Sequence, residues 1–116
     1  MNKTKLTVEE TFALAFNNHK KNNFKVAEEL YIEILNTNPK HFESNFFLGT
    51  LLAQLKKFEN SKQYLSQAAN IQPNNADVHN NLGNVLKEIG EYAEAKKYYE
   101  KTIEINPNFV LAHSNL

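Results

Sequence analysis

The sequence contains no cysteine and no arginine, and each absence removes a class of function. Without cysteine there is no disulfide framework, no thiolate metal centre and no cysteine nucleophile, and a reducing compartment, the cytoplasm, is the expected location. All 13 basic side chains counted as Lys or Arg are lysines, and 13 acidic residues balance them. Because surfaces that follow nucleic-acid phosphates use arginine for bidentate contacts, we expect no nucleic-acid partner.

Long apolar runs are absent as well. No segment approaches the roughly 18 to 20 apolar residues that span a membrane, and no apolar run of signal-peptide length follows the lysines in residues 1–5. We therefore expect a soluble protein without membrane insertion. Only three glycines and three prolines occur, all at positions that a helical interpretation assigns to turns or close packing contacts.

The three prolines are regularly spaced. Each follows an amide side chain, in Asn38-Pro39, Gln72-Pro73 and Asn106-Pro107, and successive prolines stand 34 residues apart. Between them the sequence aligns on itself without a gap, and such a fixed period indicates an array of one repeated unit. The chain is thus predicted to be a single domain, residues 1–116. Its copies are residues 8–41, 42–75 and 76–109, with a partial copy over 110–116.

Each whole copy is predicted to form two antiparallel helices. Thr7 followed by Glu10 is a capping box that starts the first helix of the first copy. The second helices are expected to begin at Phe24, Phe58 and Tyr92. They end just before each proline, because proline has no amide hydrogen and restricts the residue before it. Gly90 is predicted to form the tight exit between the two helices of the third copy.

The residues shared by the copies resemble the tetratricopeptide repeat, whose signature combines Leu-Gly, Ala-x3-aromatic and a closing proline. The matching residues are Leu82, Gly83, Ala95, Tyr99 and Pro107 in the third copy, Leu48, Gly49, Leu65 and Pro73 in the second, and Leu14, Ala15, Ala27, Tyr31 and Pro39 in the first. The resemblance covers nearly the whole chain. It implies an all-α, right-handed solenoid of antiparallel helix pairs that acts as a protein- or peptide-binding scaffold.

Small residues recur where the two helices of one copy are expected to meet. Gly49 and Gly83, with Ala15 in the first copy, allow close approach of the second helix. Their small partners on that helix are Ala27, Ser61 and Ala95. The tryptophan of the family signature is replaced by Thr11, Asn45 and His79, so looser packing is expected there.

The two ends of the array are predicted to differ. Helical rotation places repeat positions 3, 10 and 14 against the preceding copy. These residues are Val78, Val85 and Ile89 in the third copy but Glu10, Asn17 and Lys21 in the first. Because a solenoid needs a polar face at its end, the amino terminus is interpreted as the true start. The carboxyl end stops inside a predicted helix, so we expect an N-terminal fragment of a longer array, or self-association through that end.

The side of each first helix that faces away from its partner is predicted to line a concave groove. The groove is expected to be aromatic toward the amino terminus of the array and rich in amides toward the carboxyl terminus. The predicted peptide-binding residues are Phe12, Phe16, Phe46, Phe47, Thr50, Asn80, Asn81, Asn84, Lys87 and Asn115.

Both halves of this groove have an alternative explanation. The phenylalanines are candidate anchors for an apolar side chain of a peptide, or they pack between neighbouring first helices or lie under residues 1–7. The asparagines resemble the asparagine-lined inner surface of the tetratricopeptide superhelix of O-linked N-acetylglucosamine transferases, where amides hold a peptide backbone. The competing explanation is that asparagine is abundant throughout this chain.

Other functions have little support. Related domains hold the acidic tails of heat-shock chaperones with a clamp of Lys, Asn and Arg, but the matching positions here are Phe12, Phe16, Phe47, Asp77 and Asn81. The four histidines show no metal-ligand spacing. We therefore predict no catalytic residue, no metal and no cofactor. The alternative function is a substrate-selecting N-terminal arm of a larger glycosyltransferase-like enzyme.

Overall fold

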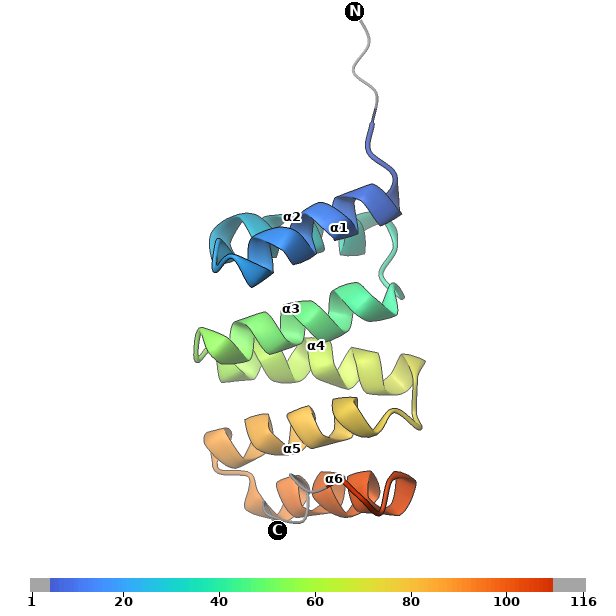
Figure 1. Ribbon diagram of the computed structural model, residues 1–116. Helices are drawn as coiled ribbons and strands as arrows, with labels where there is room; N and C mark the ends of the chain where they lie inside the picture. Colours follow the sequence, from blue (N-terminus) through green and yellow to red (C-terminus); the bar gives the residue numbers. More distant parts are fainter. Residues whose placement is uncertain (1–4, 110–116) are drawn as a thin grey trace, which may run out of the picture.

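The computed structural model describes residues 5–109, which form six α-helices and no strand (Figure 1). Their bounds are α1 Val8–Lys20, α2 Phe24–Thr37, α3 Phe42–Gln54, α4 Phe58–Ile71, α5 Ala76–Ile89 and α6 Tyr92–Ile105. Consecutive helices pair into three hairpins that stack along one axis. The predicted all-α array of helix pairs is confirmed.

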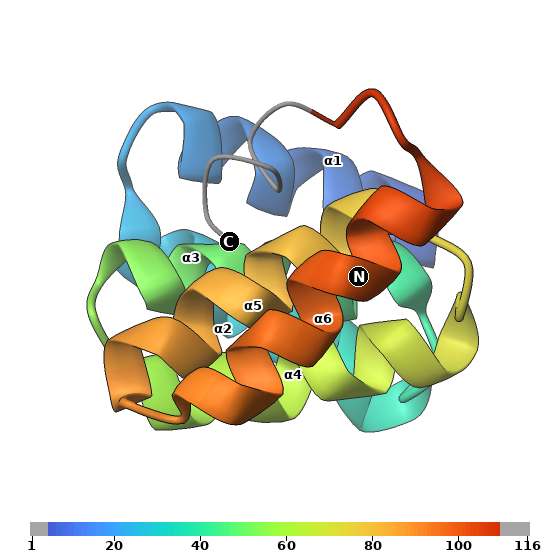
Figure 2. The same cartoon turned by 90° about the horizontal axis from the view of Figure 1, so that it is seen from below.

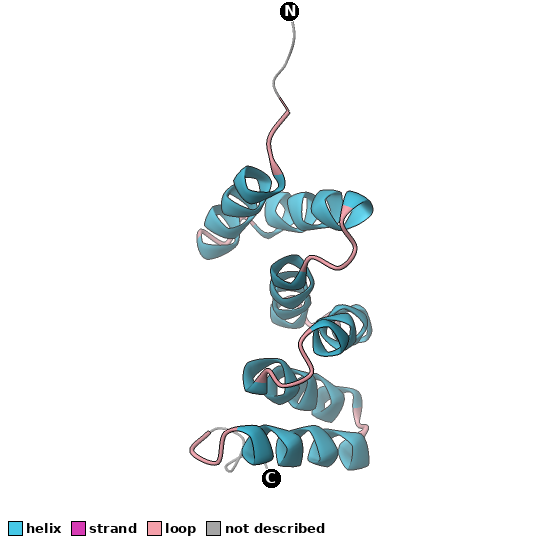
Figure 3. Cartoon of the chain, turned by 90° about the vertical axis from the view of Figure 1, so that its right-hand side faces the viewer, coloured by secondary structure: helices cyan, strands magenta, loops and turns pink. Residues whose placement is uncertain are grey.

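The first and second helices of the hairpins occupy different layers (Figure 2, Figure 3). The first helices contact one another, α1 with α3 and α3 with α5, whereas no such contact joins any two of α2, α4 and α6. Because the first helices are closer together, the stack curves toward them. The concave side is therefore formed by α1, α3 and α5, as the sequence predicts.

The helix ends follow the local signals in the sequence. The Thr7 hydroxyl accepts a hydrogen bond from the Glu10 amide at 3.0 Å, and the Thr7 amide donates to the Glu10 carboxylate at 2.9 Å. The predicted capping box is thus confirmed. The second helices begin at the predicted aromatic residues, and each ends two residues before a proline.

Each first helix is followed by a residue in the left-handed backbone conformation. These residues are Asn22 with φ 64°, Lys56 with φ 62° and Gly90 with φ 96°, and they stand one repeat apart. The turn predicted at Gly90 is confirmed, and the same turn recurs where no glycine is present. Left-handed backbone is unstrained for glycine and tolerable for asparagine, but costs about 1 to 2 kcal/mol for other residues.

Exchanging the residue types at this turn is expected to change stability in opposite directions. Lys56→Gly should raise the free energy of unfolding by about 0.5 to 1 kcal/mol, because relief of strain exceeds the entropy cost of glycine. Gly90→Lys should lower it by a similar amount. A Cβ at Gly90 meets nothing within 4 Å, so that change isolates the backbone effect. Urea denaturation measures both variants, and a destabilised Lys56→Gly would contradict the interpretation.

Close helix contact inside the hairpins rests on the predicted small residues. A Cβ added to Gly83 would lie 2.7 Å from Cε1 of Tyr99, and one added to Gly49 would lie 2.7 Å from Cγ of Leu65. Ser61, which stands where the family usually has alanine, donates its hydroxyl to the Gly49 carbonyl at 2.6 Å. This bond satisfies a buried hydroxyl and explains the substitution.

The residues that replace the signature tryptophan form hydrogen bonds to the chain segment that precedes their own helix. Asn45 Nδ2 donates to the Pro39 carbonyl at 3.0 Å, and His79 Nε2 lies 2.6 Å from the Pro73 carbonyl. Thr11 and both of these residues are at most 4% exposed. Short polar bonds to the proline turn replace the bulk of the indole at Asn45, which is fully buried. His79 and Thr11 each line a cavity, so the looser packing expected here is found beside two of the three residues.

The end of the array at α1 has the predicted polar flank. Glu10, Asn17 and Lys21 are exposed, whereas Val78 and Val85 at corresponding positions are at most 2% exposed. The partial fourth copy, with Asn115 and the proposed self-association surface, lies outside the described residues. None of the helices in the described part of the chain combines the length and the apolar character needed to cross a membrane.

Candidate functional site

Five phenylalanines gather on the concave side, and we call them the aromatic cluster: Phe12 and Phe16 from α1, and Phe42, Phe46 and Phe47 from α3. The rings form a continuous series, with centroids 6.0 Å apart for Phe12 and Phe16, 5.0 Å for Phe16 and Phe47, and 5.1 Å for Phe46 and Phe47. Phe42 stacks on Phe46 at 5.8 Å. All five side chains are half-buried.

The aromatic cluster is supported from below by the core. Phe12 and Phe47 pack against the buried residues of the first two hairpins, and Phe46 packs against those of the next pair. Packing between neighbouring first helices is therefore real, yet every ring keeps part of its surface exposed. Lys5 and Leu6 line a cavity with Ile34 on α2 instead, so the described part of the amino-terminal segment does not cover the cluster.

A hydrogen-bonded link joins the carboxyl ends of α1 and α3 beside the cluster. His19 Nε2 lies 2.6 Å from Gln54 Oε1, and His19 Nδ1 lies 3.1 Å from the Tyr31 hydroxyl. The imidazole Nε2–H donates a hydrogen bond to the amide oxygen of Gln54, and Nδ1 accepts a hydrogen bond from the Tyr31 hydroxyl. Burial raises the pKa of Tyr31, so the phenol remains a neutral donor. Lys20 Nζ stands 4.9 Å from the Phe16 ring centroid, which adds a cation to this edge of the groove.

The amide-rich half of the groove contains a small cavity of about 190 Å³ between α3 and α5. Thr50, Asn81 and Asn84 line it, together with the apolar surfaces of Leu65 and Val85. The Tyr99 hydroxyl donates to Asn84 Oδ1 at 2.6 Å, and burial raises the pKa of Tyr99. Asn84 is therefore held in place by the second helix of its own hairpin, while Asn81 is half-buried at the cavity wall.

Asn80 is not positioned as the sequence predicts. Its side chain is 3% exposed, and its Oδ1 has no hydrogen-bond partner in the part of the chain that the structure describes. The equivalent residues Phe12 and Phe46 are long enough to reach out of the interface, whereas the short asparagine stays within it. Lys87 is exposed at the groove edge. Phe42 was not predicted, although its spacing of four residues from Phe46 on one helix face was a usable signal.

The two edges of the groove differ in charge. Glu9, Glu43 and Asp77 are exposed in the first turns of the first helices, whereas the last turns contain Lys20 and Lys87 together with the exposed Glu88. The acidic first turns and the two lysines complement the helix dipoles, so these charges also stabilise the helices. Within residues 5–109, no three His, Asp or Glu side chains are placed to hold a metal ion. The chemistry offered is thus apolar contact, amide hydrogen bonding and polarised edges.

Stacked helical hairpins with small-residue contacts and a half-aromatic concave groove define the class of α-solenoid scaffolds. Two family models match the chain, one described as tetratricopeptide repeat over residues 76–109 and one as TPR repeat over residues 49–90. Together they cover more than half of the sequence. The chain belongs to the tetratricopeptide repeat family. The family is a scaffold fold, and neither match indicates a catalytic family.

Solved structures with similar folds include MamA, with a TM-score of 0.91, 25% identity and coverage of 94% of this chain. The chain spans 64% of that MamA chain. The first TPR of Spaghetti bound to an HSP90 peptide has a TM-score of 0.89 and 19% identity, over 94% of this chain and 86% of that one. An O-GlcNAc transferase mutant of Thermobaculum terrenum has a TM-score of 0.84 and 24% identity, over 94% of this chain and 21% of that one. The last two likenesses show the fold alone. Among curated proteins nothing matches.

Proposed function

We propose that this chain is a protein-interaction module that holds an extended peptide in its concave groove. The aromatic cluster carries the proposal, because its five half-exposed rings come from two neighbouring helices and rest on the core. Aromatic residues supported in this way are the usual anchors of protein interfaces. The cytoplasm expected from the lack of cysteine is part of the same proposal.

In this proposal the two halves of the groove have different tasks. An apolar side chain of the peptide lies against the exposed surfaces of Phe16 and Phe47, and the peptide backbone continues past Thr50 and Asn81. Asparagine is suited to this because its amide both donates and accepts hydrogen bonds. The Spaghetti domain binds an HSP90 peptide, which supports peptide binding by this fold. Phenylalanines at the clamp positions favour an apolar ligand over an acidic tail.

The proposal is tested by removing one anchor from each half of the groove. A peptide is first selected against the wild-type chain from a displayed library of random peptides. Phe16→Ala combined with Asn81→Ala is expected to weaken its binding at least about tenfold, as measured by calorimetry. These residues are preferred to Phe46 and Asn84, because Phe46 packs on the core and Asn84 accepts the Tyr99 hydroxyl bond.

The matched control replaces an exposed aromatic residue outside the groove. Tyr92 lies at the start of α6 and is 68% exposed, so Tyr92→Ala should leave peptide affinity unchanged. Circular dichroism of all variants establishes that the helices are intact. Equal affinity of the double variant and the wild type would refute the assignment of the groove.

A second candidate function is a substrate-selecting arm of a larger glycosyltransferase-like enzyme. Asn81 and Asn84 favour it, because both line one cavity on the concave side. The two candidates differ in the neighbours that they require. A scaffold of this kind is accompanied by further repeats ending in a polar helix, whereas an arm is joined to a nucleotide-sugar-binding α/β domain.

A further inference from the structure

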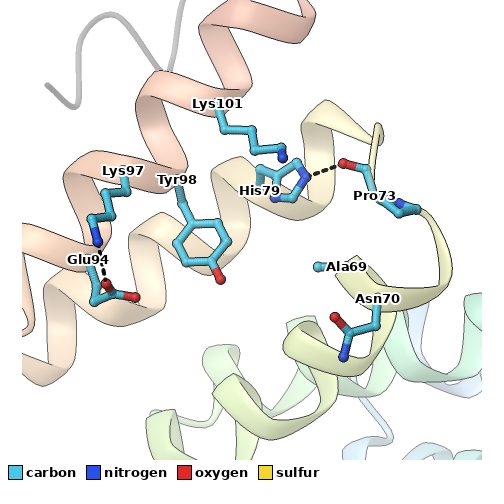
Figure 4. A pocket seen from close by; sticks show the side chains of 8 residues that line it. All are labelled: Ala69, Asn70, Pro73, His79, Glu94, Lys97, Tyr98 and Lys101. Carbon is cyan, nitrogen blue, oxygen red and sulfur yellow. Dashed lines mark hydrogen bonds and ion pairs between the residues drawn. The ribbon is translucent and has the colours of Figure 1, made fainter.

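A second cavity, which we call the outer pocket, opens away from the groove residues and has a volume of about 420 Å³ (Figure 4). It lies between the carboxyl end of α4, the first turn of α5 and the outer helix α6. Asn70, His79, Tyr98 and Lys101 are among the side chains that line it. None of these belongs to the aromatic cluster or to the amide-lined cavity of the groove.

The outer pocket results from differences between repeats. Ala69 lines it, and the residue one repeat earlier is Leu35, which packs against the core of the first two hairpins. The larger leucine occupies space that alanine leaves open. Lys97 and Lys101 likewise stand where the preceding repeat has two uncharged residues, Gln63 and Gln67. The third repeat therefore has both a larger opening and two added cations.

One wall of the outer pocket is a buried imidazole with an unused acceptor. His79 is 4% exposed and stacks on Tyr98, with ring centroids 5.7 Å apart and an interplanar angle of 23°. Its Nε2 donates to the Pro73 carbonyl at 2.6 Å, which leaves Nδ1 as an acceptor. Nδ1 is buried and has no hydrogen-bond partner among residues 5–109. Asn45 Oδ1 and Asn80 Oδ1 are also buried and unpaired among these residues, but of the three side chains only His79 lines the outer pocket. Because buried polar atoms are nearly always paired, its nitrogen points to a donor supplied from outside the chain.

The charges around the outer pocket favour a ligand with one negative group. Lys97 Nζ is 3.3 Å from a carboxylate oxygen of Glu94, so these two largely neutralise each other. Lys101 has no ion pair within the described residues and leaves one uncompensated positive charge. A single carboxylate matches this charge better than a dianionic phosphate. An amide N–H suits His79 Nδ1 better than an ammonium group, because the two lysines that flank the site repel a cation.

We propose that the outer pocket binds an acylated amino-acid carboxylate, with the carboxylate beside Lys101 and the adjoining amide N–H directed to His79 Nδ1. Ala69, Pro73 and the ring of Tyr98 provide apolar surface for its side chain. Two sources carry this chemistry, the carboxyl-terminal residue of a peptide and a free N-acyl amino acid. The site is independent of the groove, so the two proposals stand or fall separately.

The test is a titration followed by backbone amide chemical shifts, with two probes. N-acetyl-leucine represents the free compound, and Gly-Gly-Leu with a free carboxyl group represents a peptide end. At least one probe should produce saturable shifts at Asn70, His79 and Lys101, and the tighter one identifies the source. Gly-Gly-Leu amide should bind more weakly, because it lacks the carboxylate.

Three variants separate the pocket from the surface around it. Ala69→Leu restores the residue of the preceding repeat and should abolish the shifts with the fold intact. Lys101→Gln should weaken binding about threefold to fivefold, as expected for one exposed charge, and Lys96→Gln on the same helix should have no effect. Three results would each overturn the proposal in favour of a water-filled recess. They are the lack of a saturable shift with either carboxylate probe, equal shifts with the amide, and full binding by Ala69→Leu.

Discussion

Replacing one first-helix leucine with alanine should lower the free energy of unfolding far more in the second and third repeats than in the first. The leucine in question directly precedes the Gly or Ala of each first helix. Leu48→Ala and Leu82→Ala are each expected to lower the free energy of unfolding by about 2 to 4 kcal/mol. Both side chains are at most 1% exposed and belong to core clusters that include buried residues of the second helix of the preceding hairpin. Leu14→Ala should cost less than about 1 kcal/mol, because Leu14 is 44% exposed.

Urea denaturation of the three variants measures these differences. The substitution is the same in each case and lies at the same repeat position, so helix propensity cancels from the comparison. The contrast therefore reports the contact between hairpins. Similar losses in all three variants would show that Leu14 is covered in solution, which contradicts an open end at α1.

Introducing leucine at Gly83 should disrupt the third hairpin. The Cβ alone would stand 2.7 Å from the Tyr99 ring, and three further carbon atoms have no space between α5 and α6. We expect Gly83→Leu to lower the free energy of unfolding by about 3 kcal/mol, at the upper end of typical overpacking costs. The damage should be concentrated in α5 and α6, because each hairpin of a repeat array contacts only its neighbours.

Gly83→Ala is the matched control, since the first repeat already has this arrangement. Ala15 and Tyr31 stand at the repeat positions of Gly83 and Tyr99, and both are fully buried. A methyl group at Gly83 is therefore accommodated when the Tyr99 ring moves from 2.7 Å to the roughly 3.4 Å of ordinary van der Waals contact, and the better helix propensity of alanine offsets about 1 kcal/mol. Gly83→Ala should stay within about 1 kcal/mol of wild type. Equal stability of the alanine and leucine variants would mean that the two helices do not meet at Gly83.

Much of the fold was predictable because its signals are local and occur three times. The capping box at Thr7, the turn at Gly90 and the helix ends before each proline depend on a few neighbouring residues. The small residues at Gly49 and Gly83 identify the closest helix contacts without knowledge of the rest of the chain. The repeat period then supplies the stacking, which no single copy reveals.

The details of the sites were harder to predict, because they depend on side-chain length and on bonds between elements. Asn80 and Phe46 share a repeat position, yet the shorter side chain is buried. The bond from His79 to the Pro73 carbonyl depends on how the turn closes over α5. The link from His19 to Gln54 spans 35 residues, so periodicity alone does not predict it.

The most direct test of the groove is a map of backbone amide shifts on titration with the peptide selected from the displayed library. We expect the largest shifts on the concave helices α1, α3 and α5, around Phe16, Phe47 and Asn81. Shifts confined to the outer surfaces of α2, α4 and α6, with the concave helices unchanged, would contradict peptide binding in the groove.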